Sequence, residues 1–236
     1  MTLSLAACGG DNTASNVVAP GADESSKTKT LEAGAAVMQD KTPLGELNAY
    51  MDGFHFYNGN MEAQMEAHHY CGHLNEDTIQ CVIFDGNGDD AKIMGVEYIV
   101  SERLFKNLPA DEKRLWHSHM HEVRSGQLIA PGIPEVAERE FMEKIARTYG
   151  KTWHTWHTDQ QNELPLGIPM LMMGFTQDGQ ADPKMVAERD ARFEVSSTDN
   201  RKRRADIQYP PVDPGADAWQ KGIVVQLAIW RSEERR

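Results

Sequence analysis

The sequence has no long apolar segment and carries little basic charge. Its longest apolar runs, residues 169–175 and 223–230, have the length of a strand, whereas a membrane-spanning helix needs about 18–20 such residues. The formal net charge of −12 over 236 residues argues against nucleic acid as the main partner, because phosphate binding needs a basic surface. The one basic run, residues 201–204, is typical of the solvated end of a helix. We therefore expect no transmembrane helix and no nucleic-acid partner.

Several motifs that indicate a particular chemistry are also missing. The sequence contains no His-Glu-x-x-His, no Cys-x-x-Cys, no Gly-x-Ser-x-Gly and no glycine-rich phosphate loop. Residues 85–90 resemble part of a calcium loop but lack its closing Glu. The composition, with 40% hydrophobic and 25% charged residues, is that of an ordinary globular protein.

Cysteine is scarce, and one of the three lies near the start. Residues 5–8, Leu-Ala-Ala-Cys, match a bacterial lipobox, and residues 9–29 have the composition of a flexible tether. We expect acylated Cys8 to anchor the protein to membrane lipid in the bacterial cell envelope, facing the periplasm. Because no Lys or Arg precedes Cys8, we expect the numbered sequence to start within a longer precursor or at a misplaced initiator. The alternative is a chance match before a disordered start.

The other two cysteines are Cys71 and Cys81, ten residues apart. In an oxidising compartment they would be able to form a disulfide.

Residues 30–236 predict a single α+β domain, with an antiparallel or mixed β-sheet flanked by helices. The clearest local signal is a hairpin, in which the turn Gly-Asn-Gly-Asp-Asp joins strands at residues 80–85 and 91–101. Further strands are expected at residues 151–158, 166–176 and 222–230. Helices are expected at residues 30–39, 44–51, 109–116, 134–149 and 183–195.

Histidine is abundant but confined to one part of the chain. None of the nine lies before His55 or after His157, and all but His55 fall within residues 68–73, 116–122 and 153–159. Histidine is the commonest metal ligand, and side chains two apart on a strand share a face. We therefore predict a site for zinc or another transition metal, with Glu97 and Glu122 as catalytic bases or oxygen ligands. The predicted metal ligands are His69, His73, His117 and His119.

Two other interpretations of these clusters stay open. Buried histidines that only pack or form hydrogen bonds would explain the same pattern, since Trp116, Trp153 and Trp156 lie among them. Metal-free acid–base catalysis is the third interpretation. We interpret His55, which stands alone, as a structural residue.

The same segments resemble the oil body-associated protein family. The resemblance rests on residues 68–81, 95–101, 115–126, 149–152 and 164–172, and it extends from about residue 31 to residue 219. Plant members are associated with seed oil bodies and their stability, so the resemblance implies lipid-surface association. The positions that match the family pattern are His68, His69, His73, His117, His119 and Glu122. By contrast, His121, His154 and His157 fall outside it.

The combined prediction is a bacterial envelope lipoprotein of this family. It would serve lipid-surface association or envelope maintenance and contain a histidine-rich metal site. The alternative is a metal-dependent enzyme, a hydrolase or one that performs oxygen chemistry, with Glu122 or Glu97 as its base.

Overall fold

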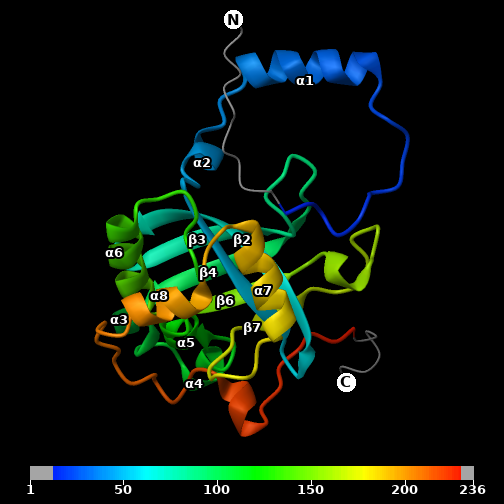
Figure 1. The fold of residues 1–236 in the computed structure, drawn as a ribbon. Helices are drawn as coiled ribbons and strands as arrows, with labels where there is room; N and C mark the ends of the chain where they lie inside the picture. The colour runs from blue at the N-terminus through cyan, green and yellow to red at the C-terminus, as the bar shows by residue number, and fades with distance from the viewer. Residues whose placement is uncertain (1–12, 230–236) are drawn as a thin grey trace, which may run out of the picture.

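Six of the seven strands close into an antiparallel barrel in the computed structural model, which describes residues 13–229 (Figure 1). The strands of the ring are β1 (Ala49–Tyr57), β2 (Asn60–Asn75), β3 (Thr78–Phe84), β4 (Ile93–Ser101), β6 (Thr148–His154) and β7 (Met170–Met173). They follow one another in the order β4-β3-β2-β1-β7-β6, and β4 closes the ring by pairing with β6. The seventh strand, β5 (His117–Ser118), adds to β6 alone.

This architecture corrects the predicted fold class. The expectation of a β-sheet flanked by helices is wrong, because the sheet closes on itself and its interior forms the core. Closure depends on pairs such as Glu97 on β4 with Thr152 on β6, which are far apart in the sequence. Strand periodicity indicates which residues share a face, but it does not indicate which distant strand will pair.

The wall of the barrel has a gap between β1 and β6, which one segment fills. Strand β1 pairs with β7 only at Phe56 and Tyr57, and β7 in turn pairs with residues 152–154 of β6. Nearer the start of β6, its residues 149–150 pair with β5 instead of β7. On the other side of the gap, Asp52 of β1 forms an isolated bridge with Ile129. The segment from β5 through the short helix α5 (Met120–Arg124) therefore enters the wall and delivers side chains to the interior.

The helices are short and lie outside the barrel (Figure 1). Helix α1 (Ser26–Met38) has no buried residue and stands away from the strands. Helix α6 (Glu135–Ile145) contributes the buried side chains Met142 and Ile145 to the core. The remaining helical segments are α2 (Thr42–Gly45), α3 (Glu102–Phe105), α4 (Ala110–Lys113), η1 (Thr158–Gln160), α7 (Pro183–Arg192), α8 (Ser197–Arg203) and η2 (Ala218–Lys221).

Two apolar clusters fill opposite ends of the barrel. The cluster toward α6 includes Met51, Cys71, Ile79, Cys81, Ile99 and Ile145. The other cluster consists of Tyr57, Met65, Ala67, Ile83, Met94 and Met172. A layer between these clusters is polar, and it contains the candidate site described below.

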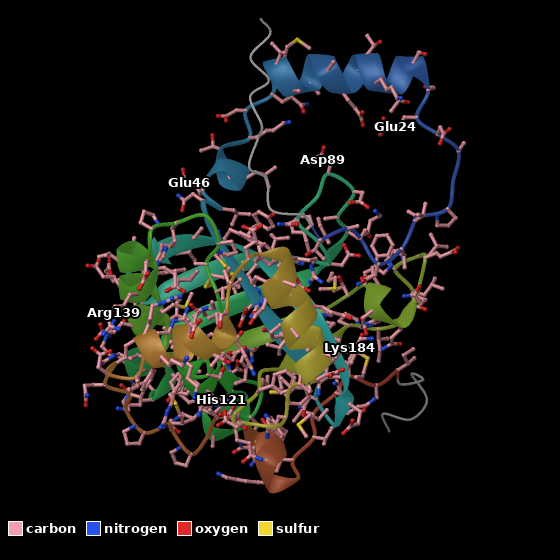
Figure 2. The ribbon with its side chains drawn as sticks, viewed as in Figure 1. Glu24, Glu46, Asp89, His121, Arg139 and Lys184 are labelled. Carbon is pink, nitrogen blue, oxygen red and sulfur yellow. A yellow bond between two sulfur atoms is a disulfide. The ribbon has the colours of Figure 1, made fainter. Side chains whose placement is uncertain are left out.

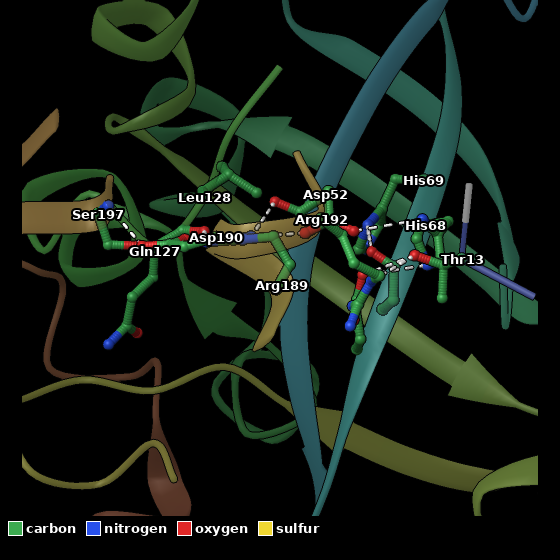
Figure 3. Close-up of polar contacts among 12 residues, drawn as sticks. Thr13, Asp52, His68, His69, Gln127, Leu128, Arg189, Asp190, Arg192 and Ser197 are labelled. Atoms are coloured by element: carbon green, nitrogen blue, oxygen red, sulfur yellow. Dashed lines mark hydrogen bonds and ion pairs between the residues drawn. The ribbon is translucent and has the colours of Figure 1, made fainter. Parts of the chain in front are cut away.

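A buried ion pair fastens α7 to the outer face of β1 and β2 (Figure 3). Arg189 and Asp52 are both fully buried, and the guanidinium of Arg189 donates to the Asp52 carboxylate. Arg189 also donates to the carbonyl oxygen of Gln127 at 2.7 Å and to the hydroxyl of Ser197 at 3.2 Å. Its guanidinium also lies 4.6 Å from the ring centroid of Phe54. The positive charge is therefore stabilised both by the aromatic ring and by the hydrogen-bond acceptors.

The local predictions have mixed outcomes. The hairpin is confirmed as β3 and β4. The helix expected at residues 44–51 is wrong, because α2 ends at Gly45 and β1 begins at Ala49. The strand expected at residues 222–230 is also wrong over its described part, where residues 222–229 form no strand. Residues 13–17, part of the predicted tether, lie against the barrel, where the backbone N–H of Asn16 donates to Asp85 at 3.1 Å.

Strands β2 and β3 are joined covalently. Cys71 and Cys81 lie opposite each other in this pairing and form a disulfide. The predicted acylation site, Cys8, lies outside the described residues. Among residues 13–229, no helix is long and apolar enough to span a membrane.

Candidate metal centre

The polar layer of the barrel interior is built by strand alternation. On β2, His69 lies between Ala67 and Cys71, and on β4, Glu97 lies between the two apolar clusters. Side chains two apart share a face, so both point inward. Strand β1 contributes His55 and β6 contributes His154 in the same way. The wall-filling segment adds His117 and His119.

Glu97 lies at the centre of this layer. Its Oε2 lies 3.0 Å from Nε2 of His69, and its Oε1 lies 3.2 Å and 3.4 Å from the Nε2 atoms of His119 and His117. Burial raises the pKa of Glu97, but hydrogen bonds from His117, His119 and His69 lower it more, so the net pKa lies well below its usual range. Burial lowers the pKa of His119, which favours its neutral form. An ionised carboxylate therefore faces the imidazole of His119, whose neutral form burial favours.

Two of these imidazoles have a fixed tautomer. Nδ1 of His119 lies 2.7 Å from Oγ1 of Thr148, which donates its own proton to the carbonyl oxygen of Ile145, so Nδ1 must be the donor. Nδ1 of His69 lies 3.0 Å from the carbonyl oxygen of Ala67, which only accepts. Nε2 of either ring can therefore donate to Glu97 only when that ring carries a second proton. In the neutral form, both Nε2 atoms direct lone pairs at the carboxylate.

Lone pairs that converge on an anion need a positive charge between them. The spacing of 3.0–3.4 Å between the Nε2 and Oε atoms matches neighbouring ligands around an ion bound at about 2.0–2.2 Å. A hydrogen bond from Nδ1 to a protein acceptor is the usual arrangement of a metal-ligating histidine. The arrangement thus fits a divalent cation.

Glu122 lies beside this group on the first turn of α5. It is buried, and its Oε2 has no hydrogen-bond partner among the described residues. Burial, with further contributions from Glu97 and Asp217, raises the pKa of Glu122 well above its usual range. One carboxylate oxygen of Glu122 and one ring nitrogen each of His117 and His119 all lie within 4.8 Å of one another. Glu122 can therefore complete the coordination of an ion or exchange a proton with a water bound to it.

Two glycines leave room for these side chains. A Cβ on Gly150 of β6 would lie 1.9 Å from Oε1 of Glu97 and 2.7 Å from Nε2 of His119. A Cβ on Gly174 would lie 2.9 Å from the carboxyl carbon of Glu122. A cavity of about 10 Å³ remains among His55, His69, Glu97, His119 and Glu122, about the room that one water or one ion needs.

The structure brings together most of the predicted site residues and leaves one out. His69, His117, His119, Glu97 and Glu122 converge as described above. His73 shares the inner face of β2 but lies four residues beyond His69, about 13 Å along the strand, and is exposed. It packs against Phe141 with ring centroids 6.4 Å apart.

Sequence reasoning missed two histidines of the cluster. Nδ1 of His55 lies 3.3 Å from Nε2 of His154, and the His55 ring lies edge-on to His69 at 4.9 Å between centroids. The signal for His55 is its alternation with Met51 and Tyr57 on the inner face of β1, which was hidden because the start of β1 was expected to be helical.

The other histidines lie away from the centre. His68 faces outward between Asp52 and Glu66 (Figure 3), with distances of 3.2 Å and 3.3 Å to their carboxylates. His157 contacts the hydroxyl of Tyr57 at 3.1 Å. His121, labelled in the lower part of Figure 2, is buried, and its Nε2 lies 4.0 Å from the carboxylate of Asp178.

Comparison with known proteins places the chain in a family. A family model described as "Protein of unknown function (DUF1264)" matches residues 41–208. Oil body-associated protein 1B of Arabidopsis thaliana is 41% identical over 218 residues, covering 92% of this chain and 90% of the relative. Oil body-associated protein 1A of Zea mays is 44% identical over 214 residues, covering 90% of each. The chain belongs to the oil body-associated protein family. Among solved structures, none matches it.

Membership in this family corrects the predicted location. The expectation of a bacterial cell envelope is wrong, because the curated relatives are plant proteins named for association with oil bodies. The family resemblance inferred from the histidine motifs is confirmed.

Proposed function

We propose that the interior of the barrel binds one divalent transition-metal ion through His69, Glu97, His117 and His119. The observation that supports this most strongly is the pair of fixed tautomers. Both His69 and His119 give their Nδ1 proton to a protein acceptor and direct Nε2 at one carboxylate. Three imidazoles and a carboxylate without a thiolate suit zinc, iron, copper or nickel.

The donor set also supports metal-dependent catalysis as the activity. An ion that takes five or six ligands would keep a position for water beside these four, and it would lower the pKa of that water. Glu122 would accept or return the proton of that water, because its Oε2 is buried without a partner beside the imidazole of His117. The reaction would be a hydrolysis or a form of oxygen chemistry, in which the ion would supply Lewis acidity and Glu122 would transfer a proton.

Metal analysis of the full chain tests the site. We expect the purified protein, stripped with a chelator and reloaded with Zn²⁺, to retain about one ion per chain after desalting. The double variant His117→Ala/His119→Ala should lose it, while His73→Gln, a histidine outside the cluster, should retain it. Equal retention by the double variant and the wild type would overturn the proposed site, and so would no retention by either.

We further propose that the protein associates with a lipid surface, as the names of its relatives indicate for them. Supporting this is an exposed apolar strip after η2, formed by Ile223, Val224, Leu227 and Ile229. Gln226 holds the strip on the barrel by donating to the carbonyl oxygens of Asn58 and Leu171, each at 3.0 Å. Transfer of one such side chain into an apolar phase contributes about 1.5–3 kcal/mol. Acylation of Cys8 stays a prediction and would add to this affinity.

Flotation with phospholipid-coated triacylglycerol droplets tests the lipid association. Leu227→Ser/Ile229→Ser should move the protein from the floating to the soluble fraction. A matched change on α1, Leu31→Ser/Val37→Ser, replaces residues of similar exposure and should leave flotation unchanged. If both double variants float as well as the wild type, the strip is not the contact.

A further inference from the structure

A second, larger cavity opens at the α6 end of the barrel. It has a volume of about 260 Å³ and lies between the starts of β3 and α3 and the end of α6. Its floor is apolar and formed by inward-facing side chains, mainly Ile79 and Ile99, with Thr148 beside them. A cavity of this size in the mouth of a barrel is a common place for a small ligand.

This mouth cavity shares a wall with the candidate metal centre. Ile99 lines both cavities, and it follows Glu97 by two residues on the same face of β4, about 7 Å along the strand. Thr148 lines the mouth cavity and also holds Nδ1 of His119. One layer of side chains therefore separates a ligand in the mouth from the polar layer.

The rim of the mouth carries three cations and three carboxylates, namely Arg103, Lys144, Arg147, Glu76, Asp77 and Glu102. Arg103 pairs with Asp77, and Glu102 pairs with Lys106. The two other cations, Lys144 and Arg147, have exposed partners, and Arg147 donates to the carbonyl oxygen of Gln208 at 3.0 Å. Nζ of Lys144 lies 2.7 Å from the carboxylate of Glu76, whose side chain is 92% exposed. The nearest carboxylate to Arg147 is that of Glu143, at 3.9 Å. Ion pairs at such exposed positions contribute little net stability, so a carboxylate held over the floor can replace Glu76 at small cost.

We propose that the mouth cavity binds an aliphatic carboxylate. The hydrocarbon chain lies on Ile79 and Ile99, and the carboxylate pairs with Lys144 and Arg147 at the rim. The binding site stands on the cavity alone and needs no metal. If the proposed metal centre is also occupied, the chain of the ligand ends beside Ile99, next to Glu97.

Calorimetric titration of the full chain with octanoate, in the presence of a chelator, tests this site. We expect saturable binding to the wild type, and a loss of affinity of at least about tenfold in Lys144→Glu/Arg147→Glu. Lys184→Glu, on α7 and far from the mouth (Figure 2), should bind like the wild type. Acetate, which lacks the chain, and octanol, which lacks the charge, should each bind at least about tenfold more weakly.

Three outcomes of the titration would contradict the proposed site in whole or in part. Absence of octanoate binding to the folded wild type overturns the proposal, and so does equal affinity in the rim variant. If octanol binds as tightly as octanoate, the proposed pairing of a carboxylate with the rim is wrong. Because the titration is performed without metal, its failure leaves the metal analysis unaffected. Failure of the metal analysis together with saturable octanoate binding would reject only the metal centre.

Discussion

Thr148 accepts the Nδ1 proton of His119 at 2.7 Å and donates its own hydroxyl proton to the carbonyl oxygen of Ile145. This bond sets which nitrogen of His119 faces Glu97. Replacement of Thr148 by Val keeps the shape of the side chain but removes the acceptor. We expect Zn²⁺ affinity to fall about 10- to 100-fold, the usual effect of losing such an outer contact.

Thr152 offers a matched control for this change. It is fully buried in the same barrel interior, and its Oγ1 has no hydrogen-bond partner among the described residues. Thr152→Val should therefore bind Zn²⁺ like the wild type and unfold at the same or a higher urea concentration. Competition with a chromophoric chelator measures both affinities, and equal values for the two variants would contradict the role of Thr148.

Gly150 provides a second prediction, because its missing side chain makes space for the centre. In Gly150→Ala the new methyl group would start 1.9 Å from Oε1 of Glu97, so the carboxylate or the strand must move. We expect a loss of about 1–3 kcal/mol in the free energy of unfolding together with loss of bound metal. Gly34→Ala is the control, since its nearest neighbour would be Met38 Cε at 3.5 Å. Urea unfolding and metal content measure the two effects.

Part of this site was predictable from residue types and alternation. The hairpin of β3 and β4 followed from its turn, and the pairing of His69 with His117 and His119 followed from their clustering. The position of each histidine along its strand could not be predicted in this way. Alternation places His73 on the same face as His69, yet only the length of β2 relative to its neighbours puts His73 at the exposed end.

Two further features depended on long-range contacts. Side chains two apart share a face only on a strand, but at His119 the chain turns with φ −87° and ψ −3° and enters α5. His119 therefore directs Nε2 to Glu97, while His121 lies near Asp178. The closure of β4 against β6 also brings Glu97 and His154 into one layer. Such pairings depend on the packing of the whole barrel, and no local sequence pattern predicts them.

Asp217 gives a prediction about pH. It accepts hydrogen bonds from the backbone N–H and hydroxyl of Ser118 at 3.0 Å and 2.7 Å, and burial raises its pKa to about 6. A raised carboxyl pKa means that the folded state favours the protonated form, so stability rises as the pH falls from about 6 to about 4. The difference between a pKa of about 6 in the folded state and the ordinary value of 3.8 corresponds to about 3 kcal/mol.

Asp217→Asn should abolish this part of the pH dependence. Asn keeps an acceptor for the N–H of Ser118, and it tolerates the left-handed φ of 52° at this position. Urea unfolding between pH 4.5 and 7, with a chelator present, compares the two proteins. Parallel stability curves for the wild type and the variant would show that Asp217 does not titrate in this range.

The ion pair between Arg189 and Asp52 gives the last prediction. In Arg189→Met the carboxylate of Asp52 stays buried without its cation, and the carbonyl oxygen of Gln127 loses a donor. We expect the free energy of unfolding to fall by about 3–5 kcal/mol. Arg192→Met, three residues from Arg189 on α7, removes a cation that is 29% exposed, so it should lose only about 1 kcal/mol or less.

A double variant separates the charge from the packing. In Asp52→Leu/Arg189→Met both charges are absent, so the loss should be smaller than in Arg189→Met alone, because no buried charge is left without a partner. Urea unfolding at pH 7 measures all variants. A double variant less stable than Arg189→Met would mean that Asp52 supports the fold through its other contacts, such as the 3.2 Å approach to His68, more than through Arg189.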